Sequence, residues 1–493
     1  MNGITSSGPP SPFSAIDIVA NSLRPDVLIK FEYAKCLSSL GYVPEIWIRS
    51  YLDSIRSLNS FVEFSPKKVG PADFLQEFND LFFSIKSNGY LPSKLDEPVK
   101  MDSDGNLISA AHRTAICAAL GLEVAVEASN QQAENYNYQY LIHGGVSADT
   151  LGLSLISKAK ISIGIKCIIL HGILNENQRN WAKERITKNA DIYYETDLYL
   201  TEEALLYLKY INYVMFNHDI ADNWFGNLAN GFSGLKNHMI KSKGNGKTSF
   251  IFLNNVDESS LIKLKEEIRE YLGEGKYSVH TNDSYEELLE LAYYSCHPET
   301  LSILQSKSFK LDLQYAEALR SVNHKVSAAT INTEDIILGG SAALNISGIR
   351  QSNDIDLYAI TPRDSFEFKL ENVNVSLSNC SDTFTYRNCK DFIMNPSSMF
   401  RFTGFNVLAL KELSEFKKVR MEYPKDHLDV LLIQEYLSDS IVKSDWKILR
   451  RKVLFVSWKV TANYALIRIR FIQFFYNIKT IRRIVYAIRQ LRS

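Results

Sequence analysis

The sequence predicts a multidomain protein that combines α/β and α+β regions. The chain has 493 residues, more than one ordinary hydrophobic core accommodates, and its 45% apolar and 23% charged content is that of globular proteins. Between about residues 131 and 325, short β-branched runs alternate with segments of helical period, as in layered α/β structure. Further along, two strand-like runs flank a Gly-Gly-Ser turn and a helix-like segment. We therefore expect several small sheets covered by helices.

Charge and cysteine content narrow the class of protein. The formal net charge is −1, so the overall charge does not favour nucleic acid or an acidic polymer as partner. The six cysteines have no Cys-x-x-Cys spacing, which predicts buried or surface thiols in a reducing compartment. The N-terminus does not have the pattern of a secretory signal, and the sequence has no apolar run long enough for a membrane-spanning helix. We expect a cytoplasmic enzyme or binding protein.

The N-terminal part is expected to be helical at first and then mixed. Residues 1–14 are rich in Gly, Ser and Pro and are predicted to be disordered, and residues 15–130 form the first structured region. Helical spacing runs from Asp26 to Leu58, and the stretch "PADFLQEFNDLFFSIKSNGY" predicts a further helix that ends at Gly89. The stretch "PVKMDSDGNLISAAHRTAICAALGLEVAVE" then predicts a strand, an Asp-Gly turn, a short strand, a helix, a glycine stop and a strand.

His112 and Arg113, at the start of that helix, are a candidate phosphate site. An arginine adds a forked donor to a helix N-terminus, where unpaired backbone N–H groups already favour anions. The pattern resembles the Gly-x-His-Arg box of the ParB and sulfiredoxin-like fold over about 85–127, with an alanine in place of the usual glycine. The resemblance implies nucleotide binding and, in some relatives, kinase or nuclease activity. The structural alternative is that His112 caps the helix and Arg113 pairs with an acid such as Asp102 or Asp104.

The middle region, 131–325, has no role assigned from its residues. The stretch "GNGKTSFIFL" is not predicted to be a phosphate loop, because Lys241 stands where that spacing requires glycine; a turn leading into a strand is expected. Six histidines share no metal-binding spacing and are expected to be structural or surface groups: His143, His171, His218, His238, His280 and His297. The segment "GEGKYSVHTNDSYEELLELAYY" resembles proteins of bacterial surface-polysaccharide gene clusters.

The stretch "EDIILGGSAALNISGIRQSNDIDLYAI" combines two features that suit phosphoryl chemistry. A short buried strand is predicted to end at Gly339 and Gly340, and Ser341 begins a helix, so the backbone can approach a phosphate at a helix N-terminus. In the second strand, the period of two places Asp354 and Asp356 on one face, with Cα atoms about 7 Å apart. Two such carboxylates suit a hard divalent cation that is shared with phosphate oxygens.

Gly-Gly-Ser, twelve residues and then Asp-Ile-Asp resembles the signature of the DNA polymerase β-like nucleotidyltransferase superfamily. Over about 330–435, within a predicted domain at 326–440, the resemblance implies a small mixed sheet flanked by helices, with the Gly-Ser turn on the triphosphate. It also implies Mg²⁺ or Mn²⁺ on the paired aspartates and a third carboxylate on a later strand. The stretch "KDHLD" resembles the Lys-Asp-x-x-Asp run of minimal and toxin-type members, here Lys425, Asp426 and Asp429, with Lys425 among the nucleotide-binding residues.

This sequence departs from the superfamily pattern at the position of the third carboxylate. The strand expected to carry it is either "FEFKL" or "VNVSL", and the latter, with Asn372 just before it and Asn374 within it, has asparagine where an acid would suit. Glu367, Glu371 and Asp391 are the remaining candidates. Because some superfamily members lose a carboxylate and become binding or regulatory modules, an intact fold without turnover is the alternative expectation.

The tail, 441–493, is basic, aromatic and amphipathic. Residues 446–493 hold twelve Lys or Arg and no acid. Such a helix can lie on an anionic membrane surface, dock on the protein's own core, or bind nucleic acid, and we rank these alternatives in that order. The tail therefore predicts a cytoplasmic protein that associates peripherally with the inner face of a membrane.

Together these features predict a Mg²⁺- or Mn²⁺-dependent nucleotidyltransferase. A nucleoside triphosphate such as ATP would donate its nucleotidyl group to a small-molecule acceptor, such as a phosphorylated sugar, alcohol or amino acid for bacterial surface-polysaccharide biosynthesis. Asp354 and Asp356 would be catalytic and bind the metal, and Gly339, Gly340 and Ser341 would bind phosphate.

Three alternatives stay open. The first is a kinase centred on Asp104, His112 and Arg113. The second is a membrane-associated, nucleotide-sensing protein with an inactive nucleotidyltransferase fold. The third is a toxin-like tRNA nucleotidyltransferase.

Overall fold

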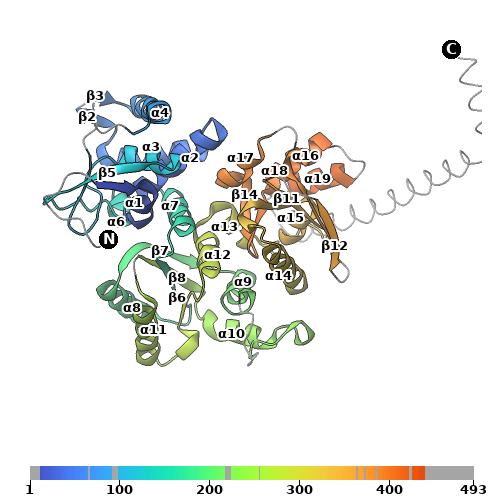
Figure 1. Ribbon diagram of the computed structural model, residues 1–493. Coiled ribbons are helices and arrows are strands. Elements are labelled where there is room, and N and C mark those ends of the chain that lie inside the picture. The colour runs from blue at the N-terminus through green and yellow to red at the C-terminus, as the bar shows by residue number, and fades with distance from the viewer. Residues whose placement is uncertain are drawn as a thin grey trace, which may run out of the picture. The chain divides into compact units, whose positions relative to one another are not determined.

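The chain forms two compact units in the computed structural model shown in Figure 1. One comprises Met1–Gly348 with Ser352–Ala409, and the other comprises Ile349–Gln351 with Leu410–Ser493. The structure describes residues 11–64, 67–90, 98–216, 224–254, 256–352, 354–361, 365–370, 373–384, 387–420 and 425–438. The first unit is mixed α/β, and its described residues form sheets of three, six, two and four strands surrounded by helices. The expectation of several small sheets with helices is confirmed.

The N-terminal part of the first unit contains two small sheets and a helical core. Its elements are β1 (Ser11–Ser14), α1 (Ala15–Asn21), α2 (Pro25–Leu40), α3 (Glu45–Asn59), β2 (Val62–Phe64), β3 (Lys67–Val69), α4 (Pro71–Asn88), β4 (Val99–Met101), α5 (Ala111–Leu120), β5 (Glu123–Ala128) and α6 (Tyr138–His143). The sheet order is β1-β5-β4, with β1 antiparallel and β4 parallel to β5. The apolar faces of α1 to α5 share one core with β4 and β5, which explains why the helical spacing of this region predicted them.

Two details of this part differ from expectation. Ser11–Ser14 pair with Glu123–Val126 as β1, so the last four residues of the segment 1–14 are a strand rather than disordered, because β5 supplies backbone hydrogen-bond partners. Residues 1–10 lie outside the described residues. The predicted short strand after the Asp-Gly turn is a single bridge between Met101 and Leu107.

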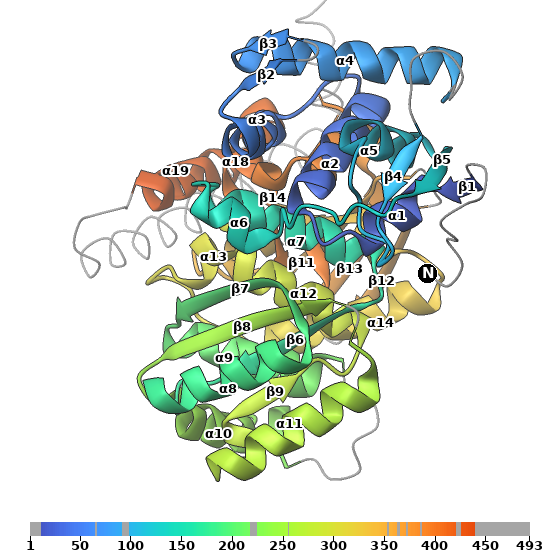
Figure 2. The same ribbon diagram turned by 90° about the vertical axis from the view of Figure 1, so that its left-hand side faces the viewer.

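The middle part is built around a four-stranded antiparallel sheet. Its elements are α7 (Ala148–Ile161), β6 (Ile165–Leu170), α8 (Glu176–Asn189), β7 (Asp191–Tyr199), α9 (Glu202–Tyr210), a π-helical turn (Ile211–Met215), α10 (Ser233–Lys243), β8 (Lys247–Asn254), α11 (Glu258–Leu272), β9 (Val279–Thr281), α12 (Tyr285–Cys296), α13 (Pro298–Leu304) and α14 (Leu313–Ala328). The strand order is β7-β8-β6-β9, so each of α8 and α11 connects two strands that are not neighbours, the arrangement of a split βαβ unit. Helices α8 and α11 cover one face of the sheet (Figure 2) and share its core.

The third part of the first unit is a six-stranded mixed sheet. Its elements are β10 (Ile336–Gly339), α15 (Gly340–Ile346), β11 (Asp354–Ala359), β12 (Phe366–Leu370), β13 (Val373–Asn379), α16 (Cys380–Thr383), α17 (Cys389–Met394), β14 (Met399–Phe402) and β15 (Phe405–Leu408). The order is β12-β13-β11-β10-β15-β14, with β11 parallel to β13, β10 parallel to β15 and the other pairs antiparallel. The strand, helix and strand predicted around Gly-Gly-Ser are therefore confirmed as β10, α15 and β11.

The second unit contributes two described helices, α18 (Leu410–Arg420) and α19 (Lys425–Ser438), together with the short segment Ile349–Gln351. The predicted domain 326–440 thus has residues in both units. The basic tail, 441–493, lies outside the described residues.

Two general expectations can be compared with the structure. All six cysteines are buried and none forms a disulfide, which agrees with thiols that take part in packing. Among the helices that the structure describes, none combines the length and apolarity that crossing a membrane requires.

Candidate active site

The register of β10 and β11 brings the glycine turn and the aspartates together. Gly339 is the direct antiparallel partner of Asp356. Ile355 and Leu357 are fully buried on one face of β11, while Asp354 and Asp356 are half-buried on the other. The alternation follows from the strand period of two, because an apolar residue at every second position fixes which face is covered.

The two glycines are required by the side chains above them. A Cβ atom at Gly340 would lie 2.1 Å from Oδ2 of Asp356, and one at Gly339 would lie 2.6 Å from the ring of Tyr358. Gly340 also has a φ of +60°, a left-handed conformation that glycine adopts at little cost. The carboxylate of Asp356 therefore rests against the backbone of the glycine turn, close to where the resemblance expects a triphosphate.

Ser341 belongs to a short chain of hydrogen bonds beside the aspartates. Its hydroxyl is hydrogen-bonded to that of Ser352, and it is only 4% exposed. The Ser352 hydroxyl in turn donates to the Asp354 carbonyl oxygen at 2.8 Å and accepts from its N–H at 3.2 Å. Ser341 would have to exchange its bond to Ser352 to contact a phosphate through its hydroxyl.

The strand next to β11 does not supply the expected third acid. In the parallel register, Asn374 lies opposite Asp354 and Ser376 opposite Asp356, and the Ser376 hydroxyl donates to Oδ1 of Asp356 at 3.2 Å. Glu367 is one strand further away, opposite Ser376 on β12, and is exposed.

The other candidates for the third acid do not complete a site. Asp391 of α17 forms an ion pair with Arg387, which precedes that helix, and Glu371 and Asn372 lie outside the described residues. The part of the chain that the structure describes has no group of three or more His, Cys, Asp or Glu side chains placed to hold a metal ion.

Tyr315 of α14 is a neighbour of the aspartates that the sequence did not indicate. Burial, followed by the negative charges of Asp356 and Asp354, raises the pKa of its phenol. Its ring is 7% exposed. At helical spacing an aromatic residue of this kind predicts only core packing, so no local signal distinguished it.

The Lys-Asp-x-x-Asp run lies in the second unit, where both aspartates are engaged. Lys425 is the first residue of α19 and is half-buried. Lys417 contacts Asp426 at 2.9 Å and Asp429 at 2.8 Å, and all three side chains are 1% exposed. Arg350 binds Asp429 with two further hydrogen bonds. These carboxylates are therefore held in buried ion pairs.

The His112 site has a different environment from the one expected. His112 does not cap α5: the N-cap is Ala110, which has a φ of +68° and stands in a conformation that favours glycine. The His112 ring is 3.0 Å from the Tyr51 hydroxyl and packs edge-on against Phe78. Burial, and then the charges of nearby lysines, holds the pKa of His112 well below its usual range, so the imidazole is neutral near pH 7.

Arg113, the other residue of the predicted phosphate site, is half-buried. Asp102 and Asp104 are the acids that the sequence suggested as its partners. Asp102 accepts hydrogen bonds from the backbone N–H groups of Asp104, Asn106 and Ala133, which identifies it as a turn-stabilising carboxylate. Three backbone donors hold the pKa of Asp102 low against the opposing effect of burial.

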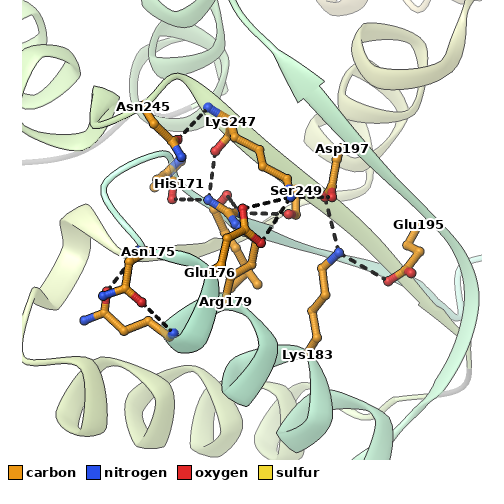
Figure 3. Close-up of polar contacts among 12 residues, drawn as sticks. His171, Asn175, Glu176, Arg179, Lys183, Glu195, Asp197, Asn245, Lys247 and Ser249 are labelled. Carbon is orange, nitrogen blue, oxygen red and sulfur yellow. Dashed lines mark hydrogen bonds and ion pairs between the residues drawn. The ribbon is translucent and has the colours of Figure 1, made fainter.

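The "GNGKTSFIFL" segment is the turn and strand expected. Figure 3 shows the polar contacts of Lys247, with which the strand begins. Lys247 begins β8, and its ammonium group pairs with Glu176 at 3.1 Å and Asp197 at 3.2 Å. Arg179 is 1% exposed and donates to the Ser249 hydroxyl at 2.7 Å and to the Lys247 carbonyl oxygen at 2.9 Å. Lys247 of this segment and Arg179 of α8 therefore hold α8 against the sheet.

Three histidines of the middle region have polar partners, and the buried His238 packs against the rings of Tyr213 and Trp224. His171 is 2.8 Å from the ammonium nitrogen of Lys209, His280 pairs with Glu287 at 2.7 Å, and His297 caps α13. His218 lies outside the described residues. The expectation of structural histidines agrees with these contacts.

Comparisons of the chain with protein-family models, with curated proteins and with solved structures found no match.

Proposed function

We propose that the chain is a divalent-metal-dependent nucleotidyltransferase whose site is formed by β10, α15 and β11. The observation that supports the proposal is the contact between the Asp356 carboxylate and the Gly340 backbone, since a carboxylate lies directly beside a glycine turn. Asp354 lies two residues away on the same strand face. Two half-buried carboxylates on one strand face repel each other, and a shared divalent cation would relieve that repulsion.

The two carboxylates match the number of ligands that a protein usually contributes to a bound Mg²⁺ ion. Mg²⁺ commonly takes one or two carboxylates and completes its octahedron with water and substrate phosphate oxygens. Asp354 and Asp356 would hold the ion. When bound, the ion would neutralise charge on the phosphates and stabilise the transition state.

In the proposed reaction an acceptor oxygen attacks the α-phosphorus of a nucleoside triphosphate. The bond from that phosphorus to the bridging oxygen breaks, and pyrophosphate leaves. The backbone at Gly339, Gly340 and Ser341 would lie along the β- and γ-phosphates. The acceptor's proton must pass to a base, and because Asn374 and Ser376 occupy the positions beside the aspartates, we propose that solvent or the acceptor's own phosphate takes it.

A nucleotide-binding domain without turnover is the second candidate. The same register supports it, because an amide and a hydroxyl replace the carboxylate that active members of the resembled superfamily carry. The kinase alternative at His112 and Arg113 has less support, since the neutral imidazole of His112 is occupied by Tyr51. A small phosphorylated acceptor and peripheral attachment through 441–493 remain proposals from the sequence.

The test is pyrophosphate release from each of the four NTPs with Mg²⁺, together with binding of a fluorescent NTP analogue. We compare the full chain, Asp354→Asn/Asp356→Asn, and the control Asp382→Asn, an exposed acid on α16. Release that is lost in the double variant and kept in the control supports the transferase. Binding that depends on the two aspartates, without release from any NTP plus candidate acceptors, supports the binding module. No metal-dependent NTP binding would overturn both.

A further inference from the structure

The face of the four-stranded sheet opposite α8 and α11 holds a group of buried basic side chains. Val279 belongs to the core that β9 shares with α8 and α11, so the strand period places His280 on the opposite face. The residue that follows β6, His171, lies beside β9, since its backbone N–H donates to the Ser278 carbonyl oxygen at 3.0 Å. With one residue of α9 and one of α10 these form what we call the basic cluster: His171, Lys209, His238 and His280. Their exposed fractions are 4% or less.

Lys209 and His171 form the central contact of the basic cluster. The side-chain nitrogen of Lys209 is 2.8 Å from a ring nitrogen of His171, and both side chains are fully buried. Two protonated groups at this distance would repel each other strongly where water does not reach them, so the packed cluster favours neutral forms. Burial holds the pKa of Lys209 well below its usual range, and burial, followed by the charge of Lys209, does the same to the pKa of His171.

His238 is enclosed by aromatic rings. Its ring centroid lies 4.9 Å from that of Tyr213, 5.2 Å from that of Trp224 and 4.8 Å from that of Tyr277. Burial, followed by the charges of Lys209 and Lys276, lowers the pKa of His238 to about 2. A proton on this imidazole is therefore costly while α10 stays packed.

A carboxylate on α12 offsets part of the positive charge. Glu287 is 2% exposed and lies 2.7 Å from the His280 ring nitrogen. Burial raises the pKa of Glu287, so this group takes up a proton more readily in the folded protein and works against the three basic groups with lowered pKa. Other charged groups that act on the cluster or on Tyr213 lie on α8, on α11 and beside β9: Arg179, Arg269, Lys276 and Asp283.

The segment that covers the basic cluster is irregular. Helix α9 continues directly into the π-helical turn Ile211–Met215, a rare geometry that is frequent at functional sites. Asn212 in this turn is 2% exposed, and neither polar atom of its side chain has a hydrogen-bond partner among the residues that the structure describes. Water would hydrate this amide in an open form, which lowers the cost of opening the segment.

We propose that the basic cluster is an acid-sensitive latch, in which protonation of Lys209, His171 and His238 releases α9, the π-helical turn and α10 from the sheet. The sign follows from proton linkage. Between pH 6.5 and pH 10.5 an open segment binds a proton at Lys209 that the packed segment does not bind, and below pH 6.5 it also binds protons at the two histidines. Three basic groups outweigh the one opposing carboxylate, so acid favours the open form.

The test is hydrogen exchange of the full chain at pH 7.5 and pH 5.5, measured by mass spectrometry and corrected for the pH dependence of intrinsic exchange. We expect the opening equilibrium constant of α9 and α10 amides to rise at pH 5.5. Lys209→Met should reduce that rise by about 100-fold, because one proton changes the constant about 10-fold per pH unit. His238→Phe keeps a ring that cannot be protonated and should reduce the rise by about 10-fold, because a free histidine titrates in the middle of this range.

Two exposed residues provide matched controls, Lys188→Met on α8 and His143→Phe on α6, and both should keep the wild-type rise. An opening constant that does not increase with acid, or a rise that is the same in the cluster variants as in the wild type, would overturn the proposal. So would an equal rise at the amides of β8, since the whole sheet would then unfold. If Lys209→Met fails to fold, His238→Phe and the comparison with β8 still decide. The test does not depend on nucleotidyl transfer.

Discussion

At the residue scale, the candidate active site depends on a position that must lack a side chain. Gly340 combines a left-handed backbone with direct contact to the Asp356 carboxylate. Any Cβ there would displace the group that we propose binds the metal. The glycine is therefore needed for the position of the aspartate as well as for the turn.

We predict that Gly340→Ala abolishes Mg²⁺-dependent NTP binding and lowers stability by about 1–3 kcal/mol, the usual cost of strained backbone. Gly273→Ala is the matched control: Gly273 has a φ of +71°, but a Cβ there would meet no atom within 4 Å. The control should lose some stability, measured by thermal unfolding, and keep NTP binding, measured by fluorescence. If Gly340→Ala binds NTP as the control does, the Asp356 carboxylate does not contribute to the site.

At the element scale, the pairing of β11 with β13 decides the chemistry that the sheet can support. Because the two strands are parallel and in register from Asp354 to Ala359, each side chain on β11 has one lateral neighbour on β13. Asn374 is exposed beside Asp354, and nothing in its position prevents an acid from standing there. This pair of strands therefore lacks a third carboxylate because of two side chains, Asn374 and Ser376. The backbone arrangement itself is intact.

This arrangement predicts a gain of metal affinity in Asn374→Asp. A third carboxylate on the same face should tighten Mn²⁺ binding by roughly an order of magnitude, since affinity rises with the number of charged ligands. Titration calorimetry or the Mn²⁺ EPR signal measures it. Asn379→Asp makes the same change on the same strand, five residues away and on the opposite face, and should leave affinity unchanged. Equal affinities in the two variants would mean that Asp354 is not a metal ligand.

At the scale of the whole molecule, buried polar side chains connect segments that are distant in sequence. Trp47 donates to the Met394 carbonyl oxygen at 2.8 Å, and Arg401 pairs with Glu290. Lys158 of α7 is fully buried and donates to the carbonyl oxygens of Ala20 and Ser22 at 2.6 and 2.7 Å. These contacts lie within the first unit and connect its three parts.

Lys158 should make the stability of the first unit depend on pH. Burial lowers the pKa of its amine from 10.5 to about 7. Between these values the unfolded chain binds a proton that the folded chain does not, so stability rises as pH increases from 7 toward 10.5. Relative to Lys158→Met, the wild type should gain about 2 kcal/mol in free energy of unfolding between pH 7 and pH 9.

Urea denaturation of both proteins at the two pH values measures this difference. Ionisation of cysteines and tyrosines affects both proteins equally and cancels. Lys158→Met also leaves two carbonyl groups unpaired, but that cost does not vary with pH. A difference that stays constant from pH 7 to pH 9 would show that the folded protein keeps Lys158 charged.

The sequence by itself determined the local features of the candidate site. The strand period placed Asp354 and Asp356 on one face, and the glycine pair marked the turn before α15, because both depend only on neighbouring residues. Helices such as α4 followed from apolar spacing for the same reason. The tertiary neighbours of these residues do not follow from local sequence, because they depend on which distant segments pack together.

Only the tertiary structure decided the neighbours of those residues. It placed Asn374 beside Asp354, brought the Tyr51 hydroxyl to the His112 ring, and paired Arg401 with Glu290, 111 residues apart in the sequence. Sheet order and helix packing are set by the summed burial of many side chains, and no short stretch of sequence encodes them. Spacing along a strand can therefore indicate a carboxylate pair. Whether a third acid lies beside that pair depends on the neighbouring strand, and the tertiary fold selects that strand.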